Sequence, residues 1–189
     1  MRLEEIQIEI IRSRRKTMAL EITPQCAVRV RAPLGMPEEE IRRFVQEKSD
    51  WILKHLAVME KKAGELKEIR PMSAEELEAL ADRACQVIPE RVRYFAPKVG
   101  VDYGMITIRN QKTRWGSCSA RGNLNFNCLL MLAPSEVIDY VVVHELCHRK
   151  ELNHSPRFWA EVARVLPDYK RQERWLKENG KRLMARNVK

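Results

Sequence analysis

The sequence predicts an α+β fold, in which short strands and helices occupy different stretches of the chain. Residues 1–33 alternate between apolar and polar side chains, as half-buried strands do. Residues 37–59 and 73–95 instead repeat their apolar positions with the helical period. A second group of strand-like stretches follows Gly100, and the chain then returns to helices.

Residues 1–35 are predicted to form an N-terminal arm, a three-stranded antiparallel β-meander. Turn-forming stretches at residues 12–17 and 23–26 separate its three alternating runs. The alternating apolar residues are Ile6, Ile8, Ile10, Met18, Leu20, Ile22, Val28 and Val30.

Residues 36–72 are predicted to be a connecting helix followed by a charged linker over residues 60–72. Pro37 stands where a first helical residue is favoured. The three glutamates after it suit the positive end of the helix dipole.

Residues 73–189 are predicted to form the core domain. Ser73 and Glu76 have the spacing of a capping box, which marks the start of a helix. Pro89 is expected to kink or split this helix. Strands are expected at residues 105–108, around 114–119 and at 124–132, with a hairpin turn at Gly122-Asn123. Helices are expected to begin at Pro134, to run from Pro156 to about Leu166, and to run from Pro167 or Asp168 to about Met184.

The composition is that of a soluble globular protein, with 189 residues, 44% hydrophobic and 32% charged. No apolar run approaches the ~20 residues that span a bilayer, and the N-terminus lacks the pattern of a signal peptide. Five cysteines without a CxxC pair indicate free thiols in a reducing compartment. We therefore expect a cytoplasmic protein with no membrane partner.

The formal charge of +9 favours anionic partners, and nucleic acid is one of them. The basic residues are spread widely, with small clusters at residues 12–16 and 164–189. They are not interleaved with aromatic residues as in proteins that bind single strands. An ordinary solvated basic surface is the alternative interpretation.

The segment from Val141 to His148 contains the pattern His-Glu-x-x-His. At about 100° per residue, His144 and His148 lie one turn apart on one helix face, so both can bind the same metal ion. Glu145 points to the neighbouring side, where it can reach a water on the metal. The helix is apolar on almost every side, and buried polar groups need partners. A zinc ion with an activated water satisfies all three side chains.

A third ligand is expected from the bend that follows. Ser155 is a favoured N-cap and Pro156 a favoured first helical residue, so His154 lies just outside a second helix and can fold back. Glu151 is an alternative third ligand if the first helix continues that far. Glu161, on the following helix, is another.

Three protein ligands with a water are typical of a catalytic zinc site, so one Zn²⁺ is the expected cofactor. Zinc lowers the pKa of its water from 15.7 toward ~7 and Glu145 can take the proton, which together indicate a hydrolase. Arg114 and Tyr140 are the candidates for stabilising the oxyanion, although Tyr140 can equally be a core residue.

Three other functions stay open on the residues alone. A nucleotide or phosphoanhydride hydrolase could use the same metal, but the chain has no glycine-rich phosphate loop. A non-catalytic, metal-stabilised module that binds nucleic acid would have no use for Glu145. A cysteine hydrolase built on Cys118 would leave two histidines unexplained.

Further motifs stand in order along the chain. They are Arg12-Ser13, Arg15-Lys16-Thr17, Val30-Arg31-Ala32-Pro33, the run from Lys112 to Ser119, Gly122-Asn123-Leu124-Asn125, the run from Asp139 to His148, and Asn153-His154-Ser155 with Phe158-Trp159. Together they resemble the YgjP-like metallopeptidase family of metal-dependent hydrolases, whose core is related to the SprT-like zinc proteases. The resemblance covers nearly the whole chain.

The resemblance implies a minimal zincin-like core, in which a small antiparallel sheet packs on the HExxH helix. It also implies that His144, His148 and His154 hold the zinc and that Glu145 is the general base. The substrate would then be a protein or peptide.

By the same resemblance, the stretch from Trp115 to Ser119 borders the cleft. An edge strand there could pair with an extended peptide, which makes Trp115, Gly116 and Ser117 candidate substrate-binding residues beside Arg114 and Tyr140. A purely structural role, with Trp115 as a core anchor, is the alternative.

Overall fold

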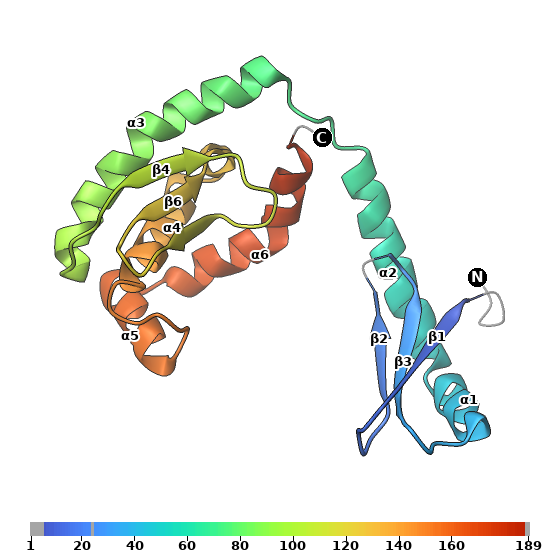
Figure 1. The fold of residues 1–189 in the computed structure, drawn as a ribbon. Helices are drawn as coiled ribbons and strands as arrows, with labels where there is room; N and C mark the ends of the chain where they lie inside the picture. The colour runs from blue at the N-terminus through green and yellow to red at the C-terminus, as the bar shows by residue number, and fades with distance from the viewer. Residues whose placement is uncertain (1–5, 24, 188–189) are drawn as a thin grey trace. The chain divides into compact units, whose positions relative to one another are not determined.

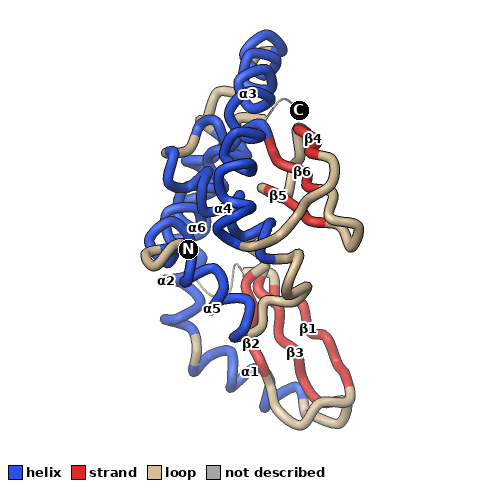
Figure 2. Tube along the Cα trace, turned by 90° about the vertical axis from the view of Figure 1, so that its left-hand side faces the viewer, coloured by secondary structure: helices blue, strands red, loops and turns tan. Residues whose placement is uncertain are grey.

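The computed structural model of the chain describes residues 6–23 and 25–187. The chain folds into two compact units, Met1–Glu68 and Ile69–Lys189. In each unit, helices pack on one side of a three-stranded sheet (Figures 1 and 2). The predicted α+β class is confirmed.

The smaller unit consists of strands β1 (Ile8–Ser13), β2 (Ala19–Ile22) and β3 (Val28–Pro33) and helices α1 (Glu38–Glu47) and α2 (Ser49–Lys67). Alternate residues of β3 face the helices, and Val28 and Val30 are fully buried. They pack in one core with Ile41 of α1 and with Ile52 and Leu56 of α2. The helical residues 38–67 therefore complete the hydrophobic core of this unit.

The strand connectivity of this unit differs from a meander. The order is β1-β3-β2, with β1 parallel to β3 and β2 antiparallel to it. The Arg12 guanidinium donates to the carbonyls of Leu34 and Met36, at 3.3 and 2.6 Å, and so joins the end of β1 to the turn after β3. The alternating pattern identified the strands, but it does not say which strand takes the central position. The most buried strand, β3, takes it.

The two helices of this unit also differ from the prediction. The expected single helix is interrupted at Lys48, whose backbone N–H donates to the carbonyl of Val45 at 3.1 Å. The residues expected as the start of a charged linker, 60–67, continue α2 instead. Most of them are good helix formers, so a high charge did not mean a loop.

The larger unit begins with the long helix α3 (Ala74–Val99). The predicted capping box is present, since Ser73 Oγ accepts from the N–H of Glu76 and the Glu76 carboxylate accepts from the N–H of Ser73. Pro89 lies inside α3 and does not split it. The buried stripe through Ile88 and Val92 continues past the proline, and its packing outweighs the ~3 kcal/mol that an interior proline costs.

The sheet of this unit has the order β4-β6-β5, from strands β4 (Ile106–Arg109), β5 (Gly116–Cys118) and β6 (Leu124–Asn127). The predicted hairpin joins β5 to β6, and Gly122 adopts φ 83° in its turn. The sheet is mixed and not antiparallel throughout, because β4 runs parallel to β6. The expected strand over residues 124–132 ends early, and its second half is the 3₁₀ helix η2 (Cys128–Leu132).

Three helices complete the larger unit: α4 (Ser135–Cys147), α5 (Pro156–Val165) and α6 (Tyr169–Ala185). Helix α4 is buried on nearly all sides, as its sequence predicts. Arg91 of α3 makes a bidentate ion pair with Asp139 of α4, at 2.6 and 2.8 Å, which raises the pKa of the arginine. This pair joins α3 to α4, the helix that carries His144 and Glu145.

Asn127 is a fully buried polar residue that the sequence pattern did not reveal. Its amide nitrogen donates to the carbonyls of Gln111 and Arg114, at 2.7 and 2.9 Å, and its oxygen accepts from the N–H of Leu129 at 3.1 Å. Asn127 therefore ties the loop before β5 to the start of η2.

We expect Asn127→Ala to lower the free energy of unfolding by roughly 2–4 kcal/mol, because three backbone groups lose their buried partner. Urea denaturation of the variant measures this loss. Asn125→Ala is the matched control, since Asn125 makes one half-buried bond, to Ser117 Oγ at 3.2 Å. Equal losses in the two variants would contradict the role given to Asn127.

Candidate metal centre

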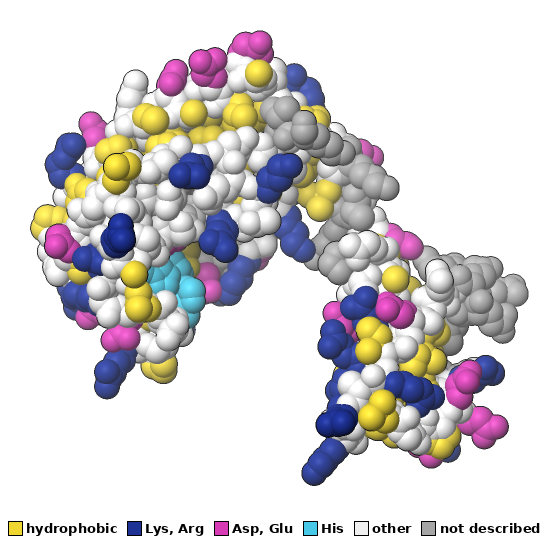
Figure 3. Space-filling view, in the orientation of Figure 1, with side chains coloured by type: hydrophobic (Ala, Val, Ile, Leu, Met, Phe, Trp, Pro, Cys, Tyr) yellow, Lys and Arg dark blue, Asp and Glu magenta, His cyan; other side chains and the backbone are white. Residues whose placement is uncertain are grey.

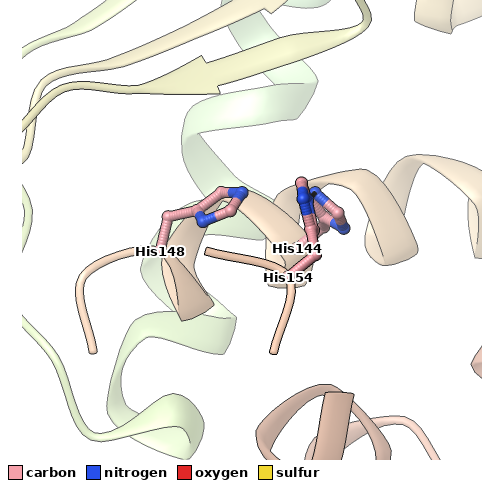
Figure 4. A group of neighbouring side chains, drawn as sticks. All are labelled: His144, His148 and His154. Atoms are coloured by element: carbon pink, nitrogen blue, oxygen red, sulfur yellow. Dashed lines mark hydrogen bonds between the residues drawn. The ribbon is translucent and has the colours of Figure 1, made fainter. Parts of the chain in front are cut away.

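Three histidines converge in the larger unit, two from the end of α4 and one from the loop before α5 (Figure 4). Each of His144, His148 and His154 contributes one ring nitrogen to the cluster. These three nitrogen atoms lie within 4.8 Å of one another. The Nε2 atoms of His144 and His154 are 2.9 Å apart. Histidine side chains reach the surface of this unit in the view of Figure 3, so the cluster is open to solvent.

The ring orientations are set by the ends of α4 and α5. His148 follows the last residue of α4, and its Nδ1 lies 3.1 Å from the backbone carbonyl of Glu151. Donation to this carbonyl leaves Nε2 with a free lone pair. Ser155 caps α5 by accepting from the N–H of Phe158 at 3.3 Å, as predicted, and this holds His154 in the bend.

The donor set fits a zinc ion. Burial and the two neighbouring histidines lower the pKa of His144 to about 3, and burial also lowers the pKa of His148. Both rings are therefore neutral at physiological pH, and neutral imidazoles are zinc ligands. The Nε2 atoms of His144 and His154, 2.9 Å apart, need a proton or a cation between them, which a shared metal ion supplies. His144 Nδ1 is buried and has no hydrogen-bond partner among the described residues.

The two alternative third ligands lie outside this cluster. Helix α4 ends at Cys147, so Glu151 is no longer on its face and contributes its backbone carbonyl to His148. The Glu161 carboxylate binds Lys150 and Arg164, at 2.9 and 3.0 Å, and these cations lower its pKa.

Glu145 is buried beside the histidines, with 6% of its surface exposed. Burial raises its pKa to about 8. Gly116 of β5 lies directly against its carboxyl group, because a Cβ added to this glycine would be 2.7 Å from Glu145 Oε1. The backbone of the edge strand thus covers the carboxyl group, a contact between residues far apart in the sequence.

The other predicted site residues have different surroundings. Trp115 packs against α6, where Gly180 leaves room for its indole ring, a contact that suits the alternative structural role. Ser117 accepts a hydrogen bond from Asn125, and the Arg114 side chain is exposed. Tyr140 is 5% exposed, burial raises its pKa, and its ring centroid lies 5.9 Å from that of His144.

An aromatic layer supports the histidines, and sequence reasoning did not identify it. Phe158 is fully buried, and its ring centroid lies 4.6–4.8 Å from those of all three histidines. Trp159 stacks on His154 at 5.7 Å and on Tyr169 at 5.3 Å. The sequence does contain a signal for this layer, the adjacent aromatic residues Phe158 and Trp159. They lie in the first turn of α5, close to the bend that holds His154.

A small sheet packed beside a helix that carries two histidines and a glutamate is an arrangement typical of metal-dependent hydrolases. The YgjP-like metallopeptidase domain matches residues 16–78 and 72–179, and the chain belongs to this family. It is therefore a metal-dependent enzyme of a peptidase family. In the described part of the chain, no helix has the length and apolar character needed to cross a membrane.

Two solved structures are similar to part of the chain. The metallopeptidase zymogen abylysin of Pyrococcus abyssi shares 23% identity over 55% of this chain and 100% of its own, with a TM-score of 0.45. The metallopeptidase zymogen jannalysin of Methanocaldococcus jannaschii shares 21% identity over 49% of this chain and 95% of its own, with a TM-score of 0.44. None of the curated proteins compared with the chain matches it.

Proposed function

We propose that the protein hydrolyses peptide bonds with one zinc ion held by His144, His148 and His154 and with Glu145 as general base. The observation that carries the proposal is the convergence of three imidazole nitrogens within 4.8 Å beside a buried carboxyl group. The free cysteines at positions 26, 85, 118, 128 and 147 suit a reducing compartment, so we place the protein in the cytoplasm.

Zinc, when bound, would supply a Lewis acid that polarises the peptide carbonyl and makes water acidic enough to ionise near pH 7. Glu145 then takes the proton from the attacking water and delivers it to the leaving amine. Its buried position suits this task, since a carboxyl group with a raised pKa both accepts and returns a proton near neutral pH. Arg114 and Tyr140 are the candidate donors to the oxyanion.

Strand β5 is the element that we propose to bind the substrate. It forms one edge of the sheet β4-β6-β5, and it contacts α4 through Gly116 and Glu145. An extended peptide could pair with the free edge of β5 at Gly116, between Trp115 and Ser117, which would place its backbone beside the histidines. This mode favours unfolded or extended substrates.

The test is a cleavage assay with the zinc-loaded and the chelator-treated protein. We expect an unfolded protein substrate to be cut by the zinc-loaded form, the cleavage to stop on chelation, and one equivalent of zinc to restore it. Nucleoside triphosphates are incubated in parallel. Hydrolysis of a nucleotide without any peptide cleavage would overturn the proposal in favour of a phosphoanhydride hydrolase.

We expect Gly116→Ala to lower the rate of peptide cleavage by roughly 10–100-fold, because the new methyl group displaces the Glu145 carboxyl group by a fraction of an ångström or more. Zinc affinity should stay close to that of the wild type, since the histidines do not move. Gly64→Ala is the control, because an added Cβ there meets no atom within 4 Å. Full activity of Gly116→Ala would show that the contact is unimportant.

A further inference from the structure

The positive charge of the larger unit is concentrated at its C-terminal end. Residues 69–169 contain 13 Lys and Arg and 12 Asp and Glu, so this stretch is nearly neutral. Residues 170–189 contain 8 Lys and Arg and 2 Asp and Glu, which is +6 of the total of +9. Most of the described part of this segment is helix α6.

The basic residues of α6 share one face. Its exposed positions are Lys170, Arg171, Arg174, Lys177, Glu178, Lys181 and Arg182, and we call the six cations among them the basic strip. Lys170, Arg174, Lys177 and Lys181 fall within about 60° of the helix circumference and extend over about 16 Å of its length. The opposite face packs in the core through Tyr169, Leu176 and Gly180.

The basic strip is unlike an ordinary solvated helix face, on which opposite charges alternate and pair. Among the described residues, only Lys177 of the strip has an ion pair, with Glu173 at 2.7 Å. Lys170 with Arg174 and Lys177 with Lys181 place like charges four residues apart, which destabilises a helix. Lys170 and Arg171 also stand in the first turn, where the helix dipole disfavours cations. An anionic partner would offset these costs.

We propose that the basic strip binds the phosphate backbone of a nucleic-acid duplex. A row of cations about 16 Å long can reach several phosphates of a double helix. The acidic side chains Glu75, Glu78, Asp82 and Glu90 are exposed on α3, where Figure 3 shows acidic groups gathered, so α3 is less favourable to a polyanion than the basic strip. Binding by this face needs no metal and is independent of the proposed peptidase activity.

The character of the strip favours a duplex over single strands and membrane surfaces. Proteins that bind single strands stack bases on exposed aromatic residues, and the exposed positions of α6 are all charged. Helices that lie on membranes insert apolar side chains, and none of the large exposed hydrophobic residues, which include Tyr94, Met105 and Leu152, belongs to α6. A rigid double helix needs only the row of cations.

The experiment measures binding of a labelled 20-base-pair DNA duplex by fluorescence anisotropy, with chelator present so that no peptidase activity contributes. The test variant carries Lys170→Gln, Arg174→Gln, Lys177→Gln and Lys181→Gln. The control carries Arg83→Gln, Arg93→Gln, Arg109→Gln and Arg121→Gln, four exposed arginines elsewhere in the same unit. Both variants lose the same charge, and glutamine is well tolerated in helices.

We expect the test variant to bind at least about thirtyfold more weakly than the wild type, and its slope of log affinity against log salt to fall by about 3–4. The control should retain most of the affinity. Equal losses in the two variants would overturn the proposal, because net charge alone would then explain binding. No binding of the duplex by the wild type, or binding of anionic lipid vesicles or an acidic peptide in its place, would overturn it as well.

Discussion

Glu145→Gln should reduce peptide cleavage by about 10³–10⁴-fold while the protein continues to bind one zinc ion. Glutamine has nearly the same shape as glutamate, so the contact with Gly116 and the packing of α4 are preserved. It cannot accept the proton of the attacking water. Single-turnover cleavage and zinc content of the same preparation measure the two properties together.

A second readout of Glu145→Gln is the pH dependence of stability without metal. The pKa of Glu145 is about 8 in the folded protein and 4.5 in the unfolded chain. The stabilising contribution of its protonated form is therefore complete below pH 4.5. It is lost as the pH rises toward 8, at a cost of roughly 3–5 kcal/mol. The ionisation of Glu145 should therefore lower the stability of the chelated wild type between pH 5 and pH 8, whereas His144 and His148, whose pKa values are lowered, act in the opposite direction.

The variant has no such group to ionise, so its stability relative to the wild type should rise between pH 5 and pH 8. Urea denaturation at the two pH values, with chelator present, measures the difference. Peptide cleavage at the wild-type rate would defeat the role of Glu145 as base. A stability difference that does not change with pH would show that its carboxyl group is not held out of water.

The parts of the site that sequence reasoning reached are those set by local geometry. Two histidines four residues apart on a helix must share a face, whatever the rest of the chain does. The Ser155-Pro156 start of α5 placed His154 in a bend for the same local reason. The placement of Glu151 away from the histidine cluster follows from the end of α4 at Cys147, a boundary that the charged residues after it did not mark.

The parts that sequence reasoning missed depend on pairing between distant segments. The contact of Gly116 with Glu145 exists because the edge strand of a small sheet lies on α4. The central position of β3 and the parallel pairing of β4 with β6 likewise depend on which strands meet, and alternation alone carries no such information. In the sequence, Asn127 does not differ from any other polar residue. Its structural role depends on the distant loop whose carbonyl groups accept its hydrogen bonds.

His154→Ala should weaken zinc binding on the order of a hundredfold or more. If a zinc site contributes roughly 10 kcal/mol through three ligands, one ligand is worth about 3 kcal/mol, which corresponds to roughly two orders of magnitude in affinity. His154 suits this test because it lies in an exposed bend, where alanine leaves no cavity in the core. Competition with a chromophoric chelator measures the affinity.

His55→Ala is the matched control, since His55 is an exposed histidine of α2 in the other unit, and it should leave zinc affinity unchanged. Glu151→Gln should also bind zinc normally, because Glu151 acts on His148 through its backbone carbonyl. Unchanged affinity in His154→Ala together with a loss in Glu151→Gln would assign the third ligand to the carboxylate. That result would mean that α4 extends by another turn when the metal binds, since only then does Glu151 share a face with His144.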